Sequence, residues 1–313
     1  MYHSTTRKDR KRSRVKLVPA IMICLCLLTF WPAPVVTEEP PPYWIRSAFK
    51  EINQQIAKYA FPNGIVGVAI KDLSSGGMFS FNSDVAFNPA SVIKVPVMVA
   101  AYHQVEEGEL SLDEQLILRD ENKLTGSGSL QFLSSGKPYT IKRLIYLMIT
   151  DSDNTATNML IHRLKPSAIN EYMREIGLVD TVIRDPSLFN KEEGQFNTTT
   201  PDDMVRLLER MYNKNLVSEK ASTEMLKIMK SQHHRWGIPR FLPKQVDIAN
   251  KPGSLDFVRN DIGIVFDKKH PYILAIFTRE LPSNHGGSVL VGSISRIIYE
   301  KRATTSVEKG HRS

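Results

Sequence analysis

The sequence predicts an α+β fold, in which an antiparallel sheet flanked by helices carries a separate all-helical lobe. Strand-like segments occur at both ends of the folded region, near residues 65–81 and 245–278, and residues of about 89–230 between them show helical periodicity. Strands first, helices in the middle and strands last favour a single sheet built from both strand sets. A cleft between the sheet and the helical lobe is then the expected place for chemistry.

The first 36 residues have the layout of an export signal. A basic segment runs directly into the apolar stretch Leu17–Trp31, as in a signal peptide or signal anchor. Because no clear small-residue cleavage site follows, two alternatives stay open. The segment is either a removed signal peptide or an anchor over about residues 17–36 that attaches the body to the membrane, outside the cytoplasm.

Charge and cysteine content narrow the possible functions of the body. The first sixteen positions hold seven basic residues and one acid, which is +6 of the formal net charge of +8. The rest of the chain therefore carries only +2, and we expect no nucleic-acid partner. Both cysteines, Cys24 and Cys26, lie in the apolar stretch, so the body has no disulfide framework and no thiolate metal site.

A proline-rich linker over residues 37–44 separates this segment from the folded part, and a helix and a hairpin then begin the domain. Apolar residues at helical spacing predict a helix over 46–60, which turn residues at 62–64 end. Two strand-like segments, 65–70 and 78–81, flank a Ser-Ser-Gly-Gly turn and predict a hairpin.

Helical periodicity dominates the middle of the chain. The last predicted helix there has a clear start signal, with Thr200 as N-cap, Pro201 as first helical residue and Asp203 as the acid of its first turn. The helices predicted in this lobe, about residues 89–230, span 92–104, 141–150, 155–163, 169–176 and 201–212.

Strands return after residue 230. We predict strands over 245–249, 260–266 and 273–278, followed by a final helix over 288–301. The folded domain is expected to span residues 45–302, with residues 303–313 as a polar tail.

Ser91 and Lys94 are the first candidate pair for catalysis. They open an apolar helix and lie one turn apart on one face, so that hydroxyl and amine can meet. A serine hydroxyl is a poor nucleophile until a base takes its proton, and a desolvated lysine can be that base. The structural alternative is a capping serine beside a solvent-facing lysine, but the apolar neighbours of Lys94 make an idle charge costly there.

Ser152 and Asn154 belong to a Ser-Asp-Asn triplet between two predicted helices. The hydroxyl can relay a proton to a leaving nitrogen, and the carboxamide can bind a substrate amide. The triplet can also cap the following helix, and the two roles are compatible.

Lys251, Gly253 and Ser254 form the third motif, just after the strand-like residues 246–250. An ammonium group there can bind a substrate carboxylate, and glycine lets the strand backbone come close. A Lys-x-Gly pattern is common by itself. It gains weight because the three motifs occur in one order at the expected element boundaries.

The three motifs resemble the Ser-x-x-Lys, Ser-Asp-Asn and Lys-Thr-Gly set of class A β-lactamases and penicillin-binding proteins. The stretches Met148–Leu160 and Asn197–Pro201 are also similar to that family. The resemblance implies a β-lactamase-like fold and a serine amide hydrolase. In it, Ser91 would be the acylated nucleophile, Lys94 its activating partner and Ser152 the proton shuttle.

The same resemblance implies the substrate-binding groups. Asn154 and Lys251 would hold the substrate, and the backbone N–H groups of Ser91 and Ser254 would form the oxyanion hole. Pro252 departs from the family, which has a hydroxyl residue between lysine and glycine. The proline removes one contact to the substrate carboxylate and one backbone N–H.

The loop before Thr198 is a second departure. A class A β-lactamase carries a glutamate there, four positions ahead of an asparagine, that activates the deacylating water. If Asn190 is that asparagine, Pro186 occupies the glutamate position. The acids nearby have other offsets and are expected to be solvated loop charges; they are Asp185, Glu192 and Glu193.

Three hypotheses follow for the substrate and the turnover. The first is a β-lactamase that opens the lactam amide and releases it by hydrolysis, and the second is an enzyme whose natural substrate is a D-alanyl peptide, with slow lactam turnover. The third is a non-catalytic lactam or peptidoglycan sensor. Nothing demands a cofactor, and a monomer is expected. No metal is expected either, because His233, His234, His270 and His285 offer no ligand pair with a carboxylate at useful helical spacing.

Overall fold

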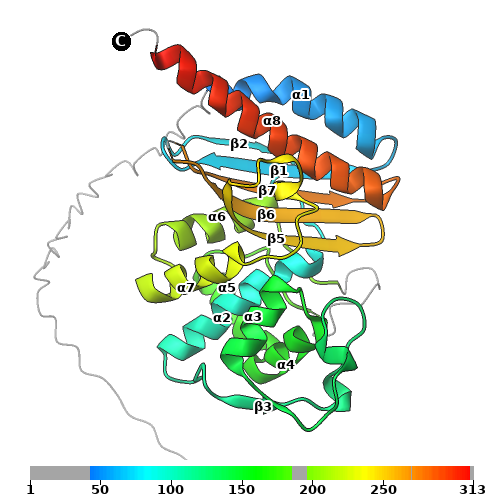
Figure 1. The fold of residues 1–313 in the computed structure, drawn as a ribbon, viewed down its shortest axis with the longest axis vertical. Helices are drawn as coiled ribbons and strands as arrows, with labels where there is room; N and C mark the ends of the chain where they lie inside the picture. Colours follow the sequence, from blue (N-terminus) through cyan, green and yellow to red (C-terminus); the bar gives the residue numbers. More distant parts are fainter. Residues whose placement is uncertain (1–42, 185–195, 269, 311–313) are drawn as a thin grey trace, which may run out of the picture. The chain divides into compact units, whose positions relative to one another are not determined.

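One antiparallel sheet of five strands, in the order β2-β1-β7-β6-β5, forms the centre of the domain (Figure 1). A computed structural model of the chain describes residues 43–184, 196–268 and 270–310. In it, β1 (Ile65–Asp72) pairs with β2 (Met78–Phe81) on one side and with β7 (Tyr272–Arg279) on the other. The prediction that the two strand sets pair into one antiparallel sheet is therefore confirmed.

Two helices from opposite ends of the domain lie side by side over one face of this sheet. They are α1 (Tyr43–Ala60) and α8 (Asn284–Gly310) (Figure 1). Strand β7 shows why both faces are covered, because its side chains alternate. Leu274 and Ile276 pack in the core beneath α1 and α8, whereas Ala275 and Phe277 belong to the core shared with the helical lobe.

In the part of the chain that the structure describes, the other face of the sheet meets a lobe of six α-helices. Helices α3 and α6 match the predicted ranges, and Thr200 caps α6 through its hydroxyl, which accepts a hydrogen bond from the backbone of Asp203. The bounds are α2 Lys94–Glu106, α3 Ile141–Thr150, α4 Asn154–Leu164, α5 Pro166–Glu175, α6 Pro201–Tyr212 and α7 Glu219–Lys230.

Several elements differ from the sequence-based prediction. Helix α7 was not predicted, nor was the two-stranded sheet of β3 (Gln115–Ile117) and β4 (Pro138–Thr140), whose three-residue strands are too short for a periodic pattern. Helix α8 ends at Gly310, nine residues beyond the predicted end of the final helix at residue 301, because no glycine or proline interrupts the chain between Arg302 and Gly310.

Strand β5 (Asp247–Leu255) also extends further than predicted, and β6 (Val258–Phe266) follows after a tight turn. Pro252 and Gly253 suggested that the strand ends before them. They are tolerated because β5 is an edge strand, so that one side of its backbone lacks a strand partner and a missing N–H breaks no ladder there.

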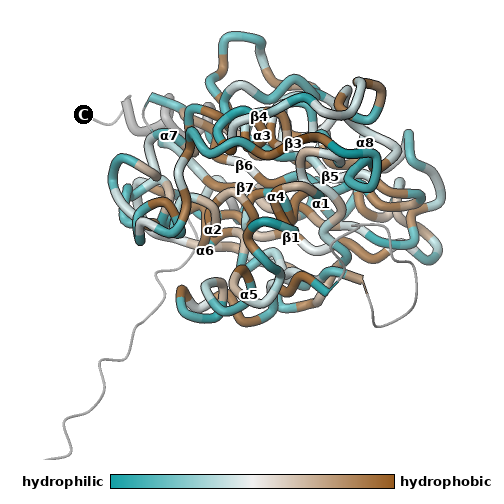
Figure 2. Tube along the Cα trace, turned by 90° about the horizontal axis from the view of Figure 1, so that it is seen from below, coloured by the Kyte–Doolittle hydropathy of each residue, from teal (hydrophilic) through white to brown (hydrophobic). Residues whose placement is uncertain are grey.

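Helix α2 runs through the middle of the lobe and is buried on all sides over its first nine residues, Lys94 to Tyr102. Figure 2 shows hydrophobic, brown segments gathered around α2 and the sheet, with hydrophilic loops at the periphery. A helix that is buried all round has no solvent-facing side. Lys94, at its start, is therefore necessarily buried.

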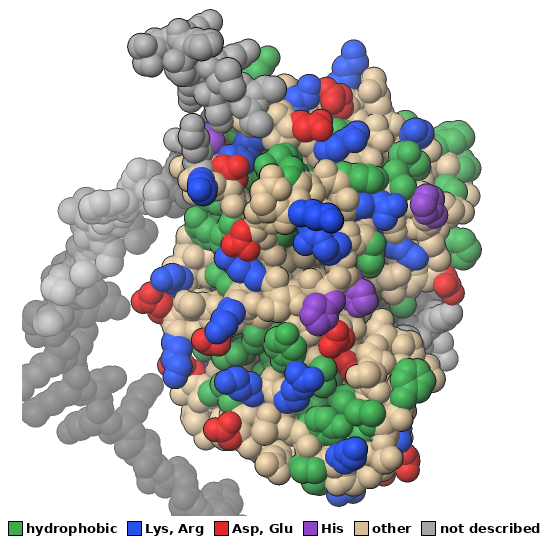
Figure 3. All heavy atoms as spheres, viewed as in Figure 1, with side chains coloured by type: hydrophobic (Ala, Val, Ile, Leu, Met, Phe, Trp, Pro, Cys, Tyr) green, Lys and Arg blue, Asp and Glu red, His purple; other side chains and the backbone are tan. Residues whose placement is uncertain are grey.

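Charged side chains are mixed on the visible surface. On the face drawn in Figure 3, basic side chains are scattered among acidic and apolar ones. In the part of the chain that the structure describes, no helix is long and apolar enough to cross a membrane. The predicted signal peptide or anchor, residues 17–36, lies outside that part.

Candidate active site

Ser91 lies in a short 3-10 helix, η1 (Ala90–Ile93), that leads into α2. The residue before it, Ala90, has φ of +48°, in the left-handed region that non-glycine residues rarely occupy. Its N–H donates to Asn88 Oδ1 over 3.0 Å, and the backbone oxygen of Asn88 accepts a hydrogen bond from Asn260 on β6 over 2.9 Å. The turn that presents Ser91 is thus fixed from the sheet.

Lys94 has no exposed surface, and its ammonium group faces the segment 152–154. Nζ donates to the backbone oxygen of Ser152 over 2.7 Å, to its Oγ over 3.1 Å and to Asn154 Oδ1 over 2.7 Å. Burial, together with the nearby charge of Lys251, lowers the pKa of Lys94 well below its ordinary value. In the described residues, Ser91 is not among the hydrogen-bond partners of Lys94 Nζ.

Ser152 lies in the link between α3 and α4, and its backbone is also left-handed, with φ of +56°. Its Oγ is within hydrogen-bond distance of two lysine ammonium groups, Lys94 Nζ at 3.1 Å and Lys251 Nζ at 3.0 Å. The next residue, Asp153, caps α4 by accepting a hydrogen bond from Ala156 N over 2.8 Å. The triplet therefore serves as a helix cap while its serine faces the two lysines.

Lys251 lies in the middle of β5 rather than after the strand. Its side chain is fully buried, and Nζ donates to Ser152 Oγ and, over 2.9 Å, to the backbone oxygen of Pro252. Burial lowers the pKa of Lys251 to about 7, against the opposing effect of the Asp261 carboxylate. Both lysines of the site are thus disposed to lose a proton more readily than exposed lysines.

Gly253 is where β5 approaches the nucleophile segment. A Cβ atom at this position would lie 2.6 Å from the backbone oxygen of Pro89 and 3.1 Å from the backbone nitrogen of Ser91. Both neighbours are backbone atoms, which cannot turn aside as a flexible side chain can. Only glycine therefore lets the edge strand come this close to Ser91.

Asn154 is nearly buried, and both ends of its carboxamide are engaged. Oδ1 accepts from Lys94 Nζ, and Nδ2 donates to the backbone oxygen of Thr125 over 2.9 Å. The amide nitrogen carries two protons, so one remains for a substrate. Thr155 holds the same loop, because its Oγ1 accepts a hydrogen bond from the backbone nitrogen of Leu124 over 3.1 Å.

A cavity of about 190 Å³ lies where these elements meet. Residues of the helical lobe and residues of the sheet both line this cavity, so it lies between the two parts, where the site was predicted. Its lining comprises Ser91, Ser127, Ser152, His234, Trp236, Pro252 and Ser254.

Three of these lining residues lie outside the three predicted motifs. Ser127 lies in the sequence Gly-Ser-Gly-Ser at residues 126–129, and its backbone oxygen accepts a hydrogen bond from Asn154 N over 3.0 Å. His234 and Trp236 follow α7, and the sequence pattern was considered at His234 only for metal binding. Their place beside Ser91 depends on how a loop folds back over the sheet, for which single-sequence periodicity carries no signal.

The loop that would carry a deacylating base is only partly described. Pro186, Asn190 and the nearby acids Asp185, Glu192 and Glu193 lie outside the described residues. The segment after it pairs with the chain just before the nucleophile. Phe87 N donates to Thr199 O over 2.9 Å, and Thr199 N donates to Phe87 O over 3.1 Å.

Comparison with known proteins identifies the family. A family model described as the β-lactamase enzyme family matches residues 47–301. The β-lactamase VEB-1 of Pseudomonas aeruginosa is 26% identical over 220 residues, which cover 65% of this chain and 73% of that protein. A β-lactamase of Streptomyces fradiae is 27% identical over 252 residues, covering 75% and 80%.

Solved structures support the same family. The structure of PBP-A is similar with a TM-score of 0.77 and 31% identity, covering 85% of this chain and 99% of that one. A β-lactamase from Sphaerobacter thermophilus is similar with a TM-score of 0.75 and 32% identity, covering 80% and 95%. The chain therefore belongs to the β-lactamase enzyme family, a family of hydrolases, and has the class A β-lactamase fold. The resemblance seen in the sequence motifs is confirmed.

Proposed function

We propose that this protein is a serine acyl-hydrolase that opens the β-lactam amide through an acyl-serine intermediate on Ser91. One observation carries the proposal. Ser152 Oγ lies 3.1 Å from Lys94 Nζ and 3.0 Å from Lys251 Nζ, and it lines the same small cavity as Ser91. A hydroxyl between two lysines of lowered pKa is suited to pass a proton, and Ser91 supplies the nucleophile beside it.

In the acylation step, Ser91 Oγ attacks the lactam carbonyl carbon, and its proton passes to Lys94 in the neutral form. Burial favours that neutral form because it lowers the pKa of this lysine. As the carbon–nitrogen bond breaks, the proton passes by way of Ser152 to the departing nitrogen, so that charge and protons balance.

The remaining groups bind and polarise the substrate. The backbone N–H groups of Ser91 and Ser254 stabilise the developing oxyanion, at about 3 kcal/mol per donor. Asn154 uses its remaining amide proton for the substrate amide, and Lys251 contributes positive charge toward the substrate carboxylate. Gly253 permits the close approach of strand and nucleophile on which this oxyanion site depends.

A second candidate function is a penicillin-binding enzyme of the D-alanyl peptidase type, which is acylated by lactams but releases them slowly. The sequence supports it, because Pro186 occupies the position expected for the deacylating glutamate. A single-residue variant of PBP-A has been solved as an acyl-enzyme complex with penicillin G. A sensor that binds lactams without turnover is the third candidate.

Time-resolved intact mass of the purified full-length protein with a penicillin distinguishes these functions. A working β-lactamase forms an adduct on Ser91 that disappears as hydrolysed product accumulates, whereas a penicillin-binding enzyme or a covalent sensor retains it. Ser91→Ala should abolish the adduct. Ser127→Ala, which removes another serine of the same cavity, should retain it. An adduct of equal size in Ser91→Ala would refute the assignment of the nucleophile.

We further propose that the protein acts outside the cytoplasm as a membrane-attached monomer. The basic and apolar layout of residues 1–36 supports export, and every proposed catalytic group lies in one chain. Cell fractionation with and without residues 1–36 tests the attachment, and light scattering of the purified protein tests the oligomeric state.

A further inference from the structure

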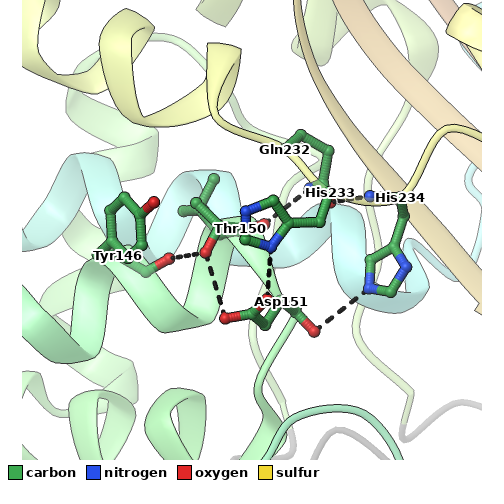
Figure 4. A network of polar contacts seen from close by, with 7 residues as sticks. Tyr146, Thr150, Asp151, Gln232, His233 and His234 are labelled. Atoms are coloured by element: carbon green, nitrogen blue, oxygen red, sulfur yellow. Dashed lines mark hydrogen bonds and ion pairs between the residues drawn. The ribbon is translucent and has the colours of Figure 1, made fainter.

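The segment that follows α7 is fastened to the link that carries Ser152. Gln232 Nε2 donates to the backbone oxygen of Ile149 over 2.7 Å, and His233 N donates to that of Thr150 over 3.2 Å. The ring of His233 reaches the carboxylate of Asp151, with 2.7 Å between Nδ1 and Oδ1 (Figure 4). The backbone of residues 232–234 is thereby held in register with the backbone that leads into the site.

His234 is oriented by the same network but belongs to the cavity. The backbone N–H of His234 donates to Gln232 Oε1 over 2.9 Å. The Nε2 atom of its ring lies 3.3 Å from the backbone oxygen of Asp151 (Figure 4). A carbonyl oxygen only accepts hydrogen bonds, so Nε2 carries a proton. The other ring nitrogen, Nδ1, accepts in the neutral ring and donates when the ring is protonated.

Among the described residues that line the cavity, His234 is the one whose side chain can carry a positive charge; the others are four serines, a tryptophan and a proline. Pro252 has neither a hydroxyl nor a backbone N–H, although it occupies the position next to Lys251. The ammonium group of Lys251 is fully buried and already donates to Ser152 Oγ and to Pro252 O. A half-buried imidazole in the same wall is therefore well placed to meet a negative group on the substrate.

We infer that His234 is a specificity-determining residue that binds the substrate carboxylate and replaces the hydroxyl contact lacking at Pro252. This inference rests on the proposed function, because it concerns the substrate of the same site. Its chemical content is a charge-assisted hydrogen bond from the imidazole ring to the carboxylate.

A penicillin and its methyl ester, which lacks the negative charge, test the inference in the full-length protein. The measured quantity is the second-order rate constant for adduct formation on Ser91, taken from intact mass. His234→Ala should lower this rate for the acid by about tenfold or more, the value of a hydrogen bond to a charged group, and leave the ester within about twofold. His234→Gln keeps a donor and should recover part of the loss.

His233→Ala is the matched control. His233 contacts the same Asp151, but it is exposed and does not line the cavity. Its loss should leave the ratio of acid to ester rates unchanged. If His233→Ala and His234→Ala lower both rates alike, the segment only positions Ser152, and the inference is wrong.

The ratio of acid to ester rates is a readout that a structural role alone would not change. Failure of the wild type to form any Ser91 adduct would contradict the proposed function instead of this inference.

Discussion

The burial of Lys251 predicts how the stability of the domain depends on pH. Its pKa is about 7 in the folded protein and 10.5 in an unfolded chain, so between these values the folded protein binds fewer protons. The free energy of unfolding should therefore increase with pH over this window. Each pH unit contributes about 1.4 kcal/mol, so the gain from about pH 7 to about pH 9 is at most about 3 kcal/mol.

Lys251→Met removes the titrating group and keeps most of the side-chain volume. The unfolding free energy of this variant should lack the part of the increase between about pH 7 and about pH 9 that Lys251 contributes, about 1.4 kcal/mol per pH unit. Lys94 acts in the same direction and remains in this variant, because burial, together with the charge of Lys251, lowers its pKa. Below about pH 7 the trend is different, since burial raises the pKa of Asp261 to about 7 and stability then decreases as pH rises. The unfolding free energies of the wild type and Lys251→Met should therefore be compared above about pH 7.

Urea unfolding of the full-length protein, followed by tryptophan fluorescence at about pH 7, 8 and 9, measures these slopes. Lys227→Met, which removes an exposed lysine of α7, is the control for a general charge effect. It should follow the wild type. If Lys251→Met gives the same slope as the wild type, Lys251 does not titrate as its burial requires, and the proposed electrostatics of the site fail with it.

Two further variants test the packing that positions the nucleophile. Gly253→Ala places a methyl group against Pro89 O. It should lower the free energy of unfolding by about 1–3 kcal/mol, measured by urea unfolding, and slow Ser91 acylation by about a hundredfold, measured by intact mass. Unchanged acylation would contradict the close approach of β5 to Ser91. Asp153→Ala removes the acceptor for Ala156 N and Leu130 N, so a loss of about 2–4 kcal/mol is expected in the same unfolding assay, and Asp153→Ser should recover part of it. A loss below about 0.5 kcal/mol would show that water replaces both hydrogen bonds.

The layout of the fold could be predicted because its signals are local. The start of α6 at Thr200-Pro201 and the hairpin of β1 and β2 depend on neighbouring residues, and the structure confirms both. The end of β5 was missed because Pro252 and Gly253 are turn residues in most contexts, and their effect depends on whether the strand lies at an edge. That position is a property of the whole sheet, which no short window of sequence contains.

The residues of the candidate site could likewise be predicted only where a local motif marks them. Ser91, Lys94, Ser152 and Lys251 could be proposed from motifs, and the structure brings them together, although their roles stay predictions. The expected contact between Lys94 and Ser91 is replaced by hydrogen bonds from Lys94 to the segment 152–154. His234 was missed because its significance comes from a contact with Asp151, 83 residues away in the chain.

The site is held in place against its own energetic cost. Ala90 and Ser152 are left-handed without being glycine, at about 1–3 kcal/mol each, and the site also buries the side chains of Lys94 and Lys251. Such an arrangement persists only if the surrounding elements determine it, and here those elements come from both parts of the fold. Asn260 on the sheet fixes the turn at Ala90, whereas residues 232–234 fix the link at Ser152. Because the hydrogen bond between Lys251 and Ser152 joins the two parts at the site, loosening either support should displace the proton relay before it unfolds the domain.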